Sequence, residues 1–214
     1  MSIINVLVCT ALMFCTPLMA TQSKPNIVYI LVDDMGYGDV KALNPNCKFP
    51  MPHLDDMAAK GMIFTDAHTN SSCCTPTRYG IMTGRYAWRG PLKRGVVNGF
   101  SNLIIEKKRT TVASLLKSQG YATACIGKWH MGLDWPIKNG TKTVDYDKDI
   151  SGGPLDVGFD YYFGLAASLG MAPHGFVENR RLNGERLMVG KKGKSKDQKS
   201  PFFQCRPGPG IKGF

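Results

Sequence analysis

The stretch from Asn26 to Val32 limits the possible folds of this chain more than any other part of the sequence. Its residues are apolar or β-branched almost throughout, with polar residues on both sides. Such a run is typical of a strand that is buried on both faces in a parallel sheet. A second run, Tyr121–Ile126, follows a helical pattern over Val112–Gln119 that Thr110-Thr111 can cap and Gly120 can end. Strands that alternate with helices predict an α/β fold.

Further elements are predicted between these two runs. Pro52–Gly61 has proline near its start and glycine at its end, which predicts a helix. Met62–Ala67 is predicted to be the next strand. A helix that includes Ile81 and Met82 should stop at Gly84.

The last part of the sequence shows less regular patterns. Leu187–Val189 and Phe202-Phe203 are candidates for hairpin strands. Between them, the lysine-rich stretch Lys191–Lys199 lacks apolar periodicity and is interpreted as a solvated loop, with contact to a polyanion as the alternative. Pro207–Phe214 has the character of neither helix nor strand and resembles a chain that stops within a fold.

The N-terminal segment, residues 1–20, is interpreted as a secretory signal peptide that is cut near Ala20. An uncleaved membrane anchor is the alternative, but Pro17 interrupts the apolar run, which is shorter than the ~20 residues that a bilayer requires. No other stretch is apolar enough to span a membrane. The sequence therefore predicts a secreted or periplasmic protein without a membrane span in its mature chain.

Composition and charge restrict the class of partner. With 43% hydrophobic and 20% charged residues, the chain has an ordinary globular composition, so disorder is not expected. The formal net charge of +11 favours anionic partners, which include nucleic acid, acidic lipid, and sulfated or phosphorylated molecules. Charge alone does not choose among them.

Polar residues follow both apolar runs directly. Asp33 and Asp34 come after the first run, and Lys128 and His130 come shortly after the second. Ligands in open α/β sheets bind beyond the carboxyl ends of strands, and adjacent carboxylates there call for a compensating cation. A hard divalent metal ion is the natural occupant, whereas a turn with solvated acids is the alternative.

The stretch Cys73–Arg78 has the features of a nucleophile site. Cys74 lies just ahead of Pro76, which can open a helix, and Arg78 follows four residues after Cys74. A side chain at a positively polarised helix N-terminus beside a cation suits an anionic substrate. The alternative is a buried structural cysteine before a helix that begins with proline.

The cysteine count also draws attention to this stretch. Removal of residues 1–20 leaves an odd number of cysteines, so at least one sulfur lies outside intramolecular disulfides. No Cys-x-x-Cys spacing is present, which argues against a thiolate zinc site. The remaining cysteines are Cys47, Cys73, Cys74, Cys125 and Cys205.

Taken together, these residues resemble the type I sulfatases, the formylglycine-dependent, arylsulfatase-like branch of the alkaline phosphatase superfamily. The likeness runs from about Pro25 to Asn179 and includes the Asn-Ile-x-x-Ile-x-x-Asp-Asp opening. The first family signature, Cys-x-Pro-x-Arg followed by Thr-Gly-Arg, is matched by Cys74, Pro76, Arg78, Thr83, Gly84 and Arg85. The second is matched by Gly120, Tyr121, Thr123, Gly127, Lys128, Trp129 and His130.

The resemblance implies a fold and a domain division. The family has a three-layer α/β/α architecture with a mostly parallel, alkaline-phosphatase-like sheet and a smaller C-terminal domain. Residues 21–214 are expected to form the N-terminal part of the catalytic domain, truncated, so that the later strands and the C-terminal subdomain are absent.

The resemblance also implies a mechanism. A maturation enzyme would convert Cys74 to formylglycine, whose hydrate attacks the sulfur of a sulfate ester. Asp33, Asp34 and the converted Cys74 would bind a calcium ion. Arg78 would hold the diol, Lys128 would contact the sulfate, and His130 would act as the base that lets sulfate leave.

Some positions depart from the family pattern. Thr77 stands where serine or alanine is common, and Leu169-Gly170 stands where some relatives place a substrate-facing histidine or aspartate. His174 is nearby and is the candidate substitute for substrate binding. The Asp-Asn pair and the second lysine that complete the family's metal site have no counterpart in this sequence.

The predicted function is therefore hydrolysis of sulfate esters with calcium and formylglycine as cofactors. A sulfated polysaccharide fits the basic charge, and nucleic acid is not an expected partner. One alternative is a phosphodiester or phosphonate monoester hydrolase of the same superfamily, because such relatives share the Cys-x-Pro-x-Arg nucleophile. Another is a non-catalytic truncated remnant that at most binds anions.

Overall fold

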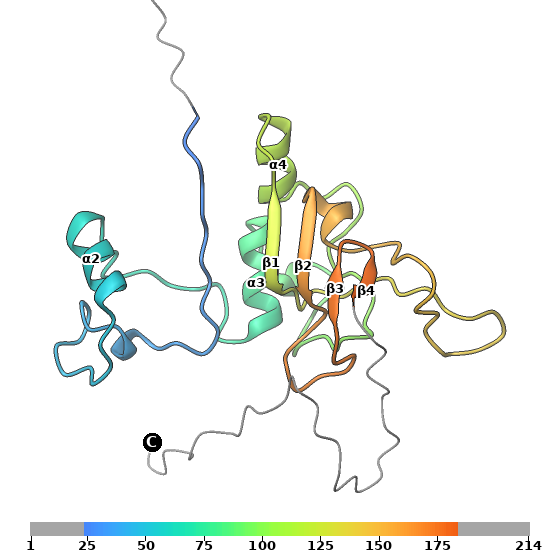
Figure 1. Ribbon diagram of the computed structural model, residues 1–214, viewed down its shortest axis with the longest axis horizontal. Helices are drawn as coiled ribbons and strands as arrows, with labels where there is room; N and C mark the ends of the chain where they lie inside the picture. The colour runs from blue at the N-terminus through green and yellow to red at the C-terminus, as the bar shows by residue number, and fades with distance from the viewer. Residues whose placement is uncertain (1–23, 184–214) are drawn as a thin grey trace, which may run out of the picture. The chain divides into compact units, whose positions relative to one another are not determined.

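The computed structural model of this protein describes residues 24–183 (Figure 1). The chain forms two compact units, Met1–Ile63 and Phe64–Phe214, and each is described by itself. The predicted signal peptide, the candidate hairpin strands and the lysine-rich stretch lie outside the described residues. None of the helices within residues 24–183 is long and apolar enough to cross a membrane.

The first unit contains two short helices. The 3₁₀-helix η1 spans Tyr37–Asp39, and α2 spans Pro52–Lys60. The predicted helix is thus confirmed: proline occupies its first turn, and the Gly61 amide donates to the Met57 carbonyl at 2.9 Å to close it. No described residue of this unit is buried.

Two predicted strands, Asn26–Val32 and Met62–Ala67, are absent from the described structure. Residues 27–32 do not pair with another strand, and their large apolar side chains are 41–83% exposed. Residues 62–67 instead contain a turn at Thr65-Asp66. An apolar run shows that a segment tends to be buried, but a strand also needs a neighbour for its backbone hydrogen bonds, and neither segment has one here.

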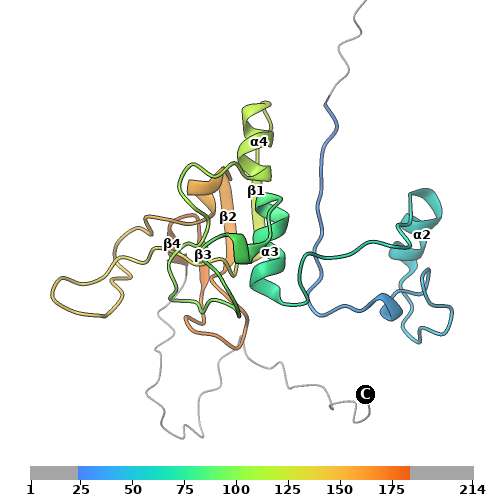
Figure 2. The same ribbon diagram turned by 180° about the vertical axis from the view of Figure 1, so that it is seen from behind.

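The second unit is built on a four-stranded sheet in the order β1-β2-β3-β4, seen from front and back in Figures 1 and 2. The strands span Ala124–Lys128, Tyr161–Leu165, Phe176–Glu178 and Arg181–Asn183. β1 and β2 are parallel, whereas β3 and β4 add antiparallel pairs. The predicted strand Tyr121–Ile126 is confirmed as β1 with later bounds.

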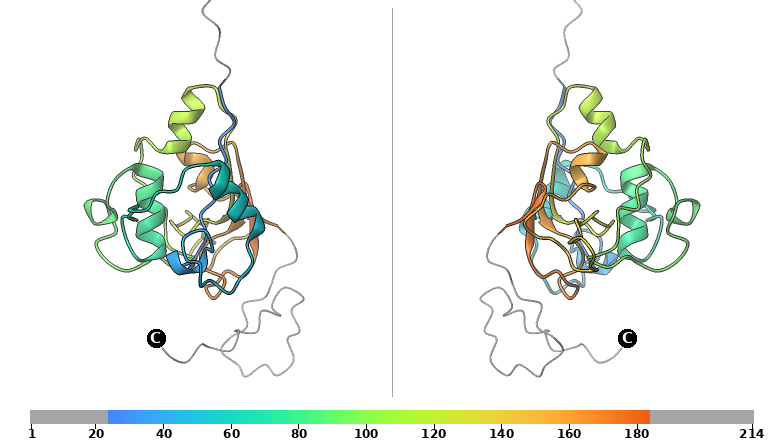
Figure 3. Two further views of the ribbon diagram at one scale, coloured as in Figure 1. Left: turned by 90° about the vertical axis from the view of Figure 1, so that its left-hand side faces the viewer. Right: turned by 90° about the vertical axis from the view of Figure 1, so that its right-hand side faces the viewer.

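Two helices lie on the same side of this sheet (Figure 3). They are α3, Cys74–Thr83, and α4, Val112–Ser118, as the sequence predicted, and the 3₁₀-helices η2, Ala87–Arg89, and η3, Pro154–Val157, connect the elements. α3 ends at Gly84, which has a φ of 64° and donates its amide to the Gly80 carbonyl. A residue with a Cβ is strained in this left-handed conformation, so glycine is the favoured terminator.

The core of the second unit is aromatic. Trp129, Tyr79 and Tyr162 are almost completely buried. The Trp129 ring packs edge-on against Phe159 and tilted against Tyr162, and its indole N–H donates to the Gly132 carbonyl at 2.8 Å. Buried indole and phenol groups need such partners, which fixes the chain just after β1.

The start of α4 is held by a buried threonine. The Thr111 hydroxyl accepts from the Ser114 amide at 3.0 Å, and the Ser114 hydroxyl accepts from the Thr111 amide at 2.9 Å. The Thr111 hydroxyl also donates to the Val157 carbonyl at 2.5 Å, which joins α4 to η3. One side chain therefore caps a helix and fixes its packing.

Substitution Thr111→Val should destabilise the complete protein by about 1–2 kcal/mol, because the Ser114 amide and the Val157 carbonyl lose their partner. The midpoint of urea unfolding measures this loss. Thr111→Ser should keep most of the stability, and Thr110→Val, at the exposed neighbouring position, is the matched control. Equal midpoints for Thr111→Val and Thr110→Val would contradict the assignment.

Candidate active site

The first turn of α3 carries the candidate nucleophile. Cys74 is the first residue of the helix, and Cys73, whose side chain makes no capping hydrogen bond, precedes it. Cys74 is partly exposed, whereas the next residue, Thr75, is completely buried. The side chain at position 74 thus starts at the positive end of the helix dipole, next to a firmly packed anchor.

Arg78 connects this helix to the end of β1. It lies one turn after Cys74, and its Nη1 donates to the Lys128 carbonyl at 2.5 Å. Lys128 is the last residue of β1, and its neighbour Trp129 donates its amide to the Leu165 carbonyl of β2 at 2.9 Å. The guanidinium therefore holds the N-terminal turns of α3 at the carboxyl end of the parallel pair.

His130 is fixed by the backbone of Val97. The His130 side chain is completely buried, and its Nε2 lies 2.8 Å from the Val97 carbonyl. Because a carbonyl oxygen only accepts, Nε2 carries the proton, and the lone pair of the neutral ring is on Nδ1. The Val97 amide in turn donates to the Thr75 hydroxyl at 3.4 Å. Val97 thus links His130 to the residue next to Cys74.

The other end of α3 is bound to Glu106. The Tyr79 hydroxyl donates to Glu106 at 2.7 Å, and Arg85 and Arg109 approach the same carboxylate at 3.3 and 3.6 Å. Burial opposes ionisation of Glu106, but the Tyr79 hydrogen bond and the two arginines still lower its pKa. Arg85, which belongs to the first signature, therefore supports the fold through its contact with Glu106.

The second signature also contains a structural contact. The Thr123 amide and hydroxyl lie 2.9 and 3.0 Å from the same Asp160 oxygen. Lys117 pairs with Asp160 at 2.6 Å, and together these hydrogen bonds lower the pKa of Asp160 to about 2. This contact joins the end of α4 to the loop that leads into β2.

The described cysteines are all free thiols, and they differ in their surroundings. Burial raises the pKa of Cys125, in the middle of β1, to about 11, although the charge of Arg78 opposes the shift. Cys125 is partly buried against the core, and its thiol is less acidic than that of an exposed cysteine. Cys74 is also partly exposed, but it lies at the N-terminus of a helix rather than within a strand.

The remaining predicted residues belong to other parts of the chain. Asp33 and Asp34 belong to the first unit, where both are exposed and Asp34 has a φ of 56°. His174 lies on the wall of a cavity in the second unit. Among the predicted residues of the second unit, Arg78 contacts the backbone of Lys128, and His130 is linked through Val97 to Thr75, the residue after Cys74.

The chemistry of the two aspartates suits calcium. Adjacent carboxylates offer the hard oxygen ligands that calcium takes, although they are fewer than the ~6–8 oxygens of a complete shell. Among residues 24–183, no group of three or more histidine, cysteine or acidic residues is positioned to hold a metal ion. Asp33 and Asp34 thus fit part of a calcium site.

The family model described as Sulfatase matches residues 25–189. The chain belongs to the sulfatase family. This sulfatase chain is 42% identical over 163 residues to an N-acetylgalactosamine-6-O-sulfatase of Bacteroides thetaiotaomicron, a match over 76% of the chain and 30% of that relative. It is also 37% identical to human arylsulfatase G over 156 residues, 72% of the chain and 26% of that relative.

Solved structures give the same result. A structure described under metabolism of multiple glycosaminoglycans by Bacteroides thetaiotaomicron matches with a TM-score of 0.67 and 41% identity, over 75% of this sulfatase chain and 32% of its own. A crystal structure of Ps i-CgsB matches with a TM-score of 0.56 and 32% identity, over 68% of this sulfatase chain and 29% of its own. The predicted α/β, alkaline-phosphatase-like fold class is confirmed. The sulfatase chain spans about a third of these relatives or less.

Sequence reasoning missed the residues that support the site. The basic segment from Trp88 to Lys108 has no clear period in the sequence, yet it contains Val97, which binds His130, and Glu106, which binds Tyr79. Val97 acts through its backbone, which leaves no mark in a sequence. For Glu106, no pattern around the residue indicates that it faces a buried tyrosine.

The different surroundings of the thiols are testable by alkylation. In the folded sulfatase at pH 8, iodoacetamide should modify Cys125 about 100-fold more slowly than the exposed Cys73, because a partly buried thiol of raised pKa provides little thiolate. Peptide mass spectrometry over time measures both rates. In urea the two rates should converge. Equal rates in the folded protein would show that packing against the core does not raise the pKa of Cys125.

Proposed function

We propose that the protein hydrolyses sulfate esters with a nucleophile derived from Cys74. The observation that carries this proposal is the hydrogen bond from Arg78 to the Lys128 carbonyl, which unites residues of the two signature stretches at one end of α3 and β1. Family membership and the names of the relatives support it. The chain resembles arylsulfatases in particular.

The first half of the reaction uses the start of α3. A maturation enzyme, using an external oxidant, oxidises Cys74 to formylglycine and removes its sulfur, and the aldehyde adds water to give a geminal diol. One diol oxygen attacks the ester sulfur, the bond from sulfur to the alcohol oxygen breaks, and the alcohol leaves with a proton. The positive charges of Arg78 and Lys128 stabilise the negative charge on the sulfuryl oxygens, and the helix N-terminus adds to this field.

The second half uses His130. The other diol hydroxyl gives its proton to Nδ1 of His130, the carbon–oxygen double bond of the aldehyde re-forms, and the bond to the sulfate oxygen breaks. The contact from Nε2 to the Val97 carbonyl supports this role, because it sets the tautomer and the orientation of the ring. A serine has only one hydroxyl, so its sulfate ester cannot release sulfate by this elimination.

Calcium is the proposed cofactor, with Asp33, Asp34 and the converted Cys74 among its ligands. The carboxylates of Asp33 and Asp34 would hold the ion, which would supply positive charge that favours ionisation of the nucleophile and stabilises the sulfuryl group. Arg78 adds a fixed cation near the nucleophile.

The proposed substrate class is sulfated polysaccharide. One relative is named for N-acetylgalactosamine 6-O-sulfate, and a further solved structure, with a TM-score of 0.52 and 29% identity, is a complex with k-i-k-neocarrahexaose. The net charge of +11 favours a polyanion. A signal peptide over residues 1–20 and a secreted or periplasmic location remain part of the same proposal, since such polymers occur outside the cell.

Release of 4-nitrophenol from 4-nitrophenyl sulfate tests the activity. The complete protein, made in a host with the maturation enzyme, should hydrolyse this ester, and Cys74→Ala should lower the rate by about 10⁴-fold or more because the nucleophile is removed. Cys73→Ser is the matched control, since it removes the neighbouring exposed thiol without a capping contact, and it should retain activity.

Metal and substrate comparisons complete this test. A chelator should abolish hydrolysis and added calcium should restore it. Failure to release sulfate at any calcium concentration would contradict the proposal. Faster hydrolysis of a phosphodiester such as bis(4-nitrophenyl) phosphate would favour the alternative superfamily activity instead.

A further inference from the structure

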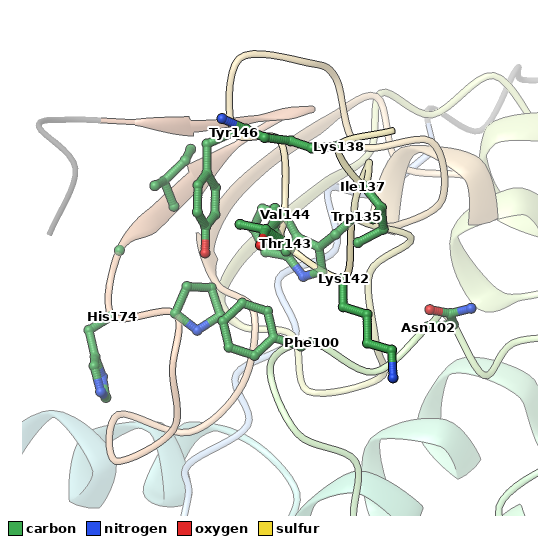
Figure 4. Close-up of a pocket in the computed structure, with 13 residues that line it drawn as sticks. Phe100, Asn102, Trp135, Ile137, Lys138, Lys142, Thr143, Val144, Tyr146 and His174 are labelled. Carbon is green, nitrogen blue, oxygen red and sulfur yellow. The ribbon is translucent and has the colours of Figure 1, made fainter. Parts of the chain in front are cut away.

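A cavity of about 660 Å³ lies in the second unit, outside the candidate active site. Its volume is within the ~300–1,000 Å³ that is usual for small-ligand pockets. Residues from three separate parts of the chain line it: Phe100 and Asn102, the segment from Trp135 to Tyr146, and the segment from Pro173 to Leu182 (Figure 4). None of the predicted catalytic residues is among them.

Aromatic rings form a fixed wall of the cavity. Trp135 packs edge-on against Tyr146 at 5.7 Å and tilted against Phe100 at 6.5 Å between ring centroids. The Trp135 indole N–H donates to the Gly99 carbonyl at 2.8 Å. These contacts hold the aromatic faces in place before any ligand arrives, so little ordering is needed on binding.

Cations extend from a short hairpin at the rim. Ile137 and Val144 form an antiparallel bridge, and the Lys138 amide donates to the Thr143 carbonyl at 2.9 Å. This hairpin carries Lys138 and Lys142, and Figure 4 shows the Lys142 side chain extending from it past the cavity. Among the described residues that line the cavity none is acidic, so its charge is positive.

Polar groups accompany the rings. The Tyr146 hydroxyl points toward the ring of Phe100 in Figure 4. Burial raises the pKa of Tyr146, so the hydroxyl stays neutral and can donate a hydrogen bond. Asn102 and His174 add further polar side chains to the lining. Rings, hydroxyl-binding groups and cations together suit a ligand that is partly apolar, rich in hydroxyls and negatively charged.

The cavity and the candidate active site share one segment of chain, residues 97–100. At one end, the Val97 carbonyl binds His130, and at the other, Phe100 lines the cavity. Gly99, between them, packs closely against Ala172, the residue before Pro173 of the cavity lining. An added Cβ at Gly99 would lie 2.1 Å from the Ala172 carbonyl oxygen. The same short segment therefore contacts both the cavity and a histidine of the candidate active site.

We propose that this cavity binds a sugar residue that carries a sulfate or carboxylate and that neighbours the sugar whose sulfate ester is cleaved. The proposal rests on the proposed function. The aromatic faces cover the apolar face of the sugar ring, Tyr146 and Asn102 bind its hydroxyls, and Lys142 pairs with its charge. The cavity thus selects a charged polymer over an isolated sulfate ester.

Binding to an inactive variant separates this proposal from catalysis. In the complete protein with Cys74→Ala, isothermal titration calorimetry with a chondroitin 6-sulfate tetrasaccharide and with a carrageenan hexasaccharide gives the dissociation constants. For the tighter ligand, added Phe100→Ala or Lys142→Gln should each raise Kd by about tenfold. Lys107→Gln removes the same charge at an exposed position outside the cavity and should leave Kd unchanged.

Turnover in the active protein adds a second measurement. Phe100→Ala and Lys142→Gln should lower kcat/KM for the oligosaccharide about tenfold more than for 4-nitrophenyl sulfate. Absence of binding by both oligosaccharides, or equal Kd values for the cavity variants and Lys107→Gln, would overturn the cavity assignment. Intact, cavity-dependent binding without any sulfate release would overturn the proposed function instead.

Discussion

The hydrogen bond from Arg78 to the Lys128 carbonyl is the interaction on which the rest of the site depends. α3 and β1 are far apart in the sequence, and this bond sets the first turns of the helix against the last residue of the strand. A charged donor on a backbone carbonyl makes a strong, directional contact. It sets Lys128, the last residue of β1, against the N-terminal turns of α3, which form the positive end of the helix dipole.

The two ends of α3 serve different purposes. The first turn presents Cys74 and anchors itself through Thr75, whose hydroxyl holds the Val97 backbone and, through it, His130. The middle of the helix and the residues after it are held to Glu106, which binds both Tyr79 and Arg85. A nucleophile needs rigid support, because the fold then fixes the position of its reacting atom relative to the substrate.

The sequence predicted α2, α3, α4 and β1, because caps, glycines and apolar periods mark them locally. It failed at Asn26–Val32, where a strand depends on a partner that the segment itself does not contain. In the site, the signature residues were found from their spacing. The supporting carbonyl of Val97 and the aromatic cavity around Trp135 were not, because backbone contacts and packing between distant segments have no local signal.

The central claim is that Cys74 is a precursor rather than a thiol nucleophile. Trypsin should release the peptide 61–78, which contains Cys73 and Cys74, from protein isolated from its natural host. After alkylation with iodoacetamide, mass spectrometry should show one alkylated cysteine, at position 73, and an aldehyde that reacts with a hydrazide at position 74. Alkylation of both residues in the host's own protein would contradict the account.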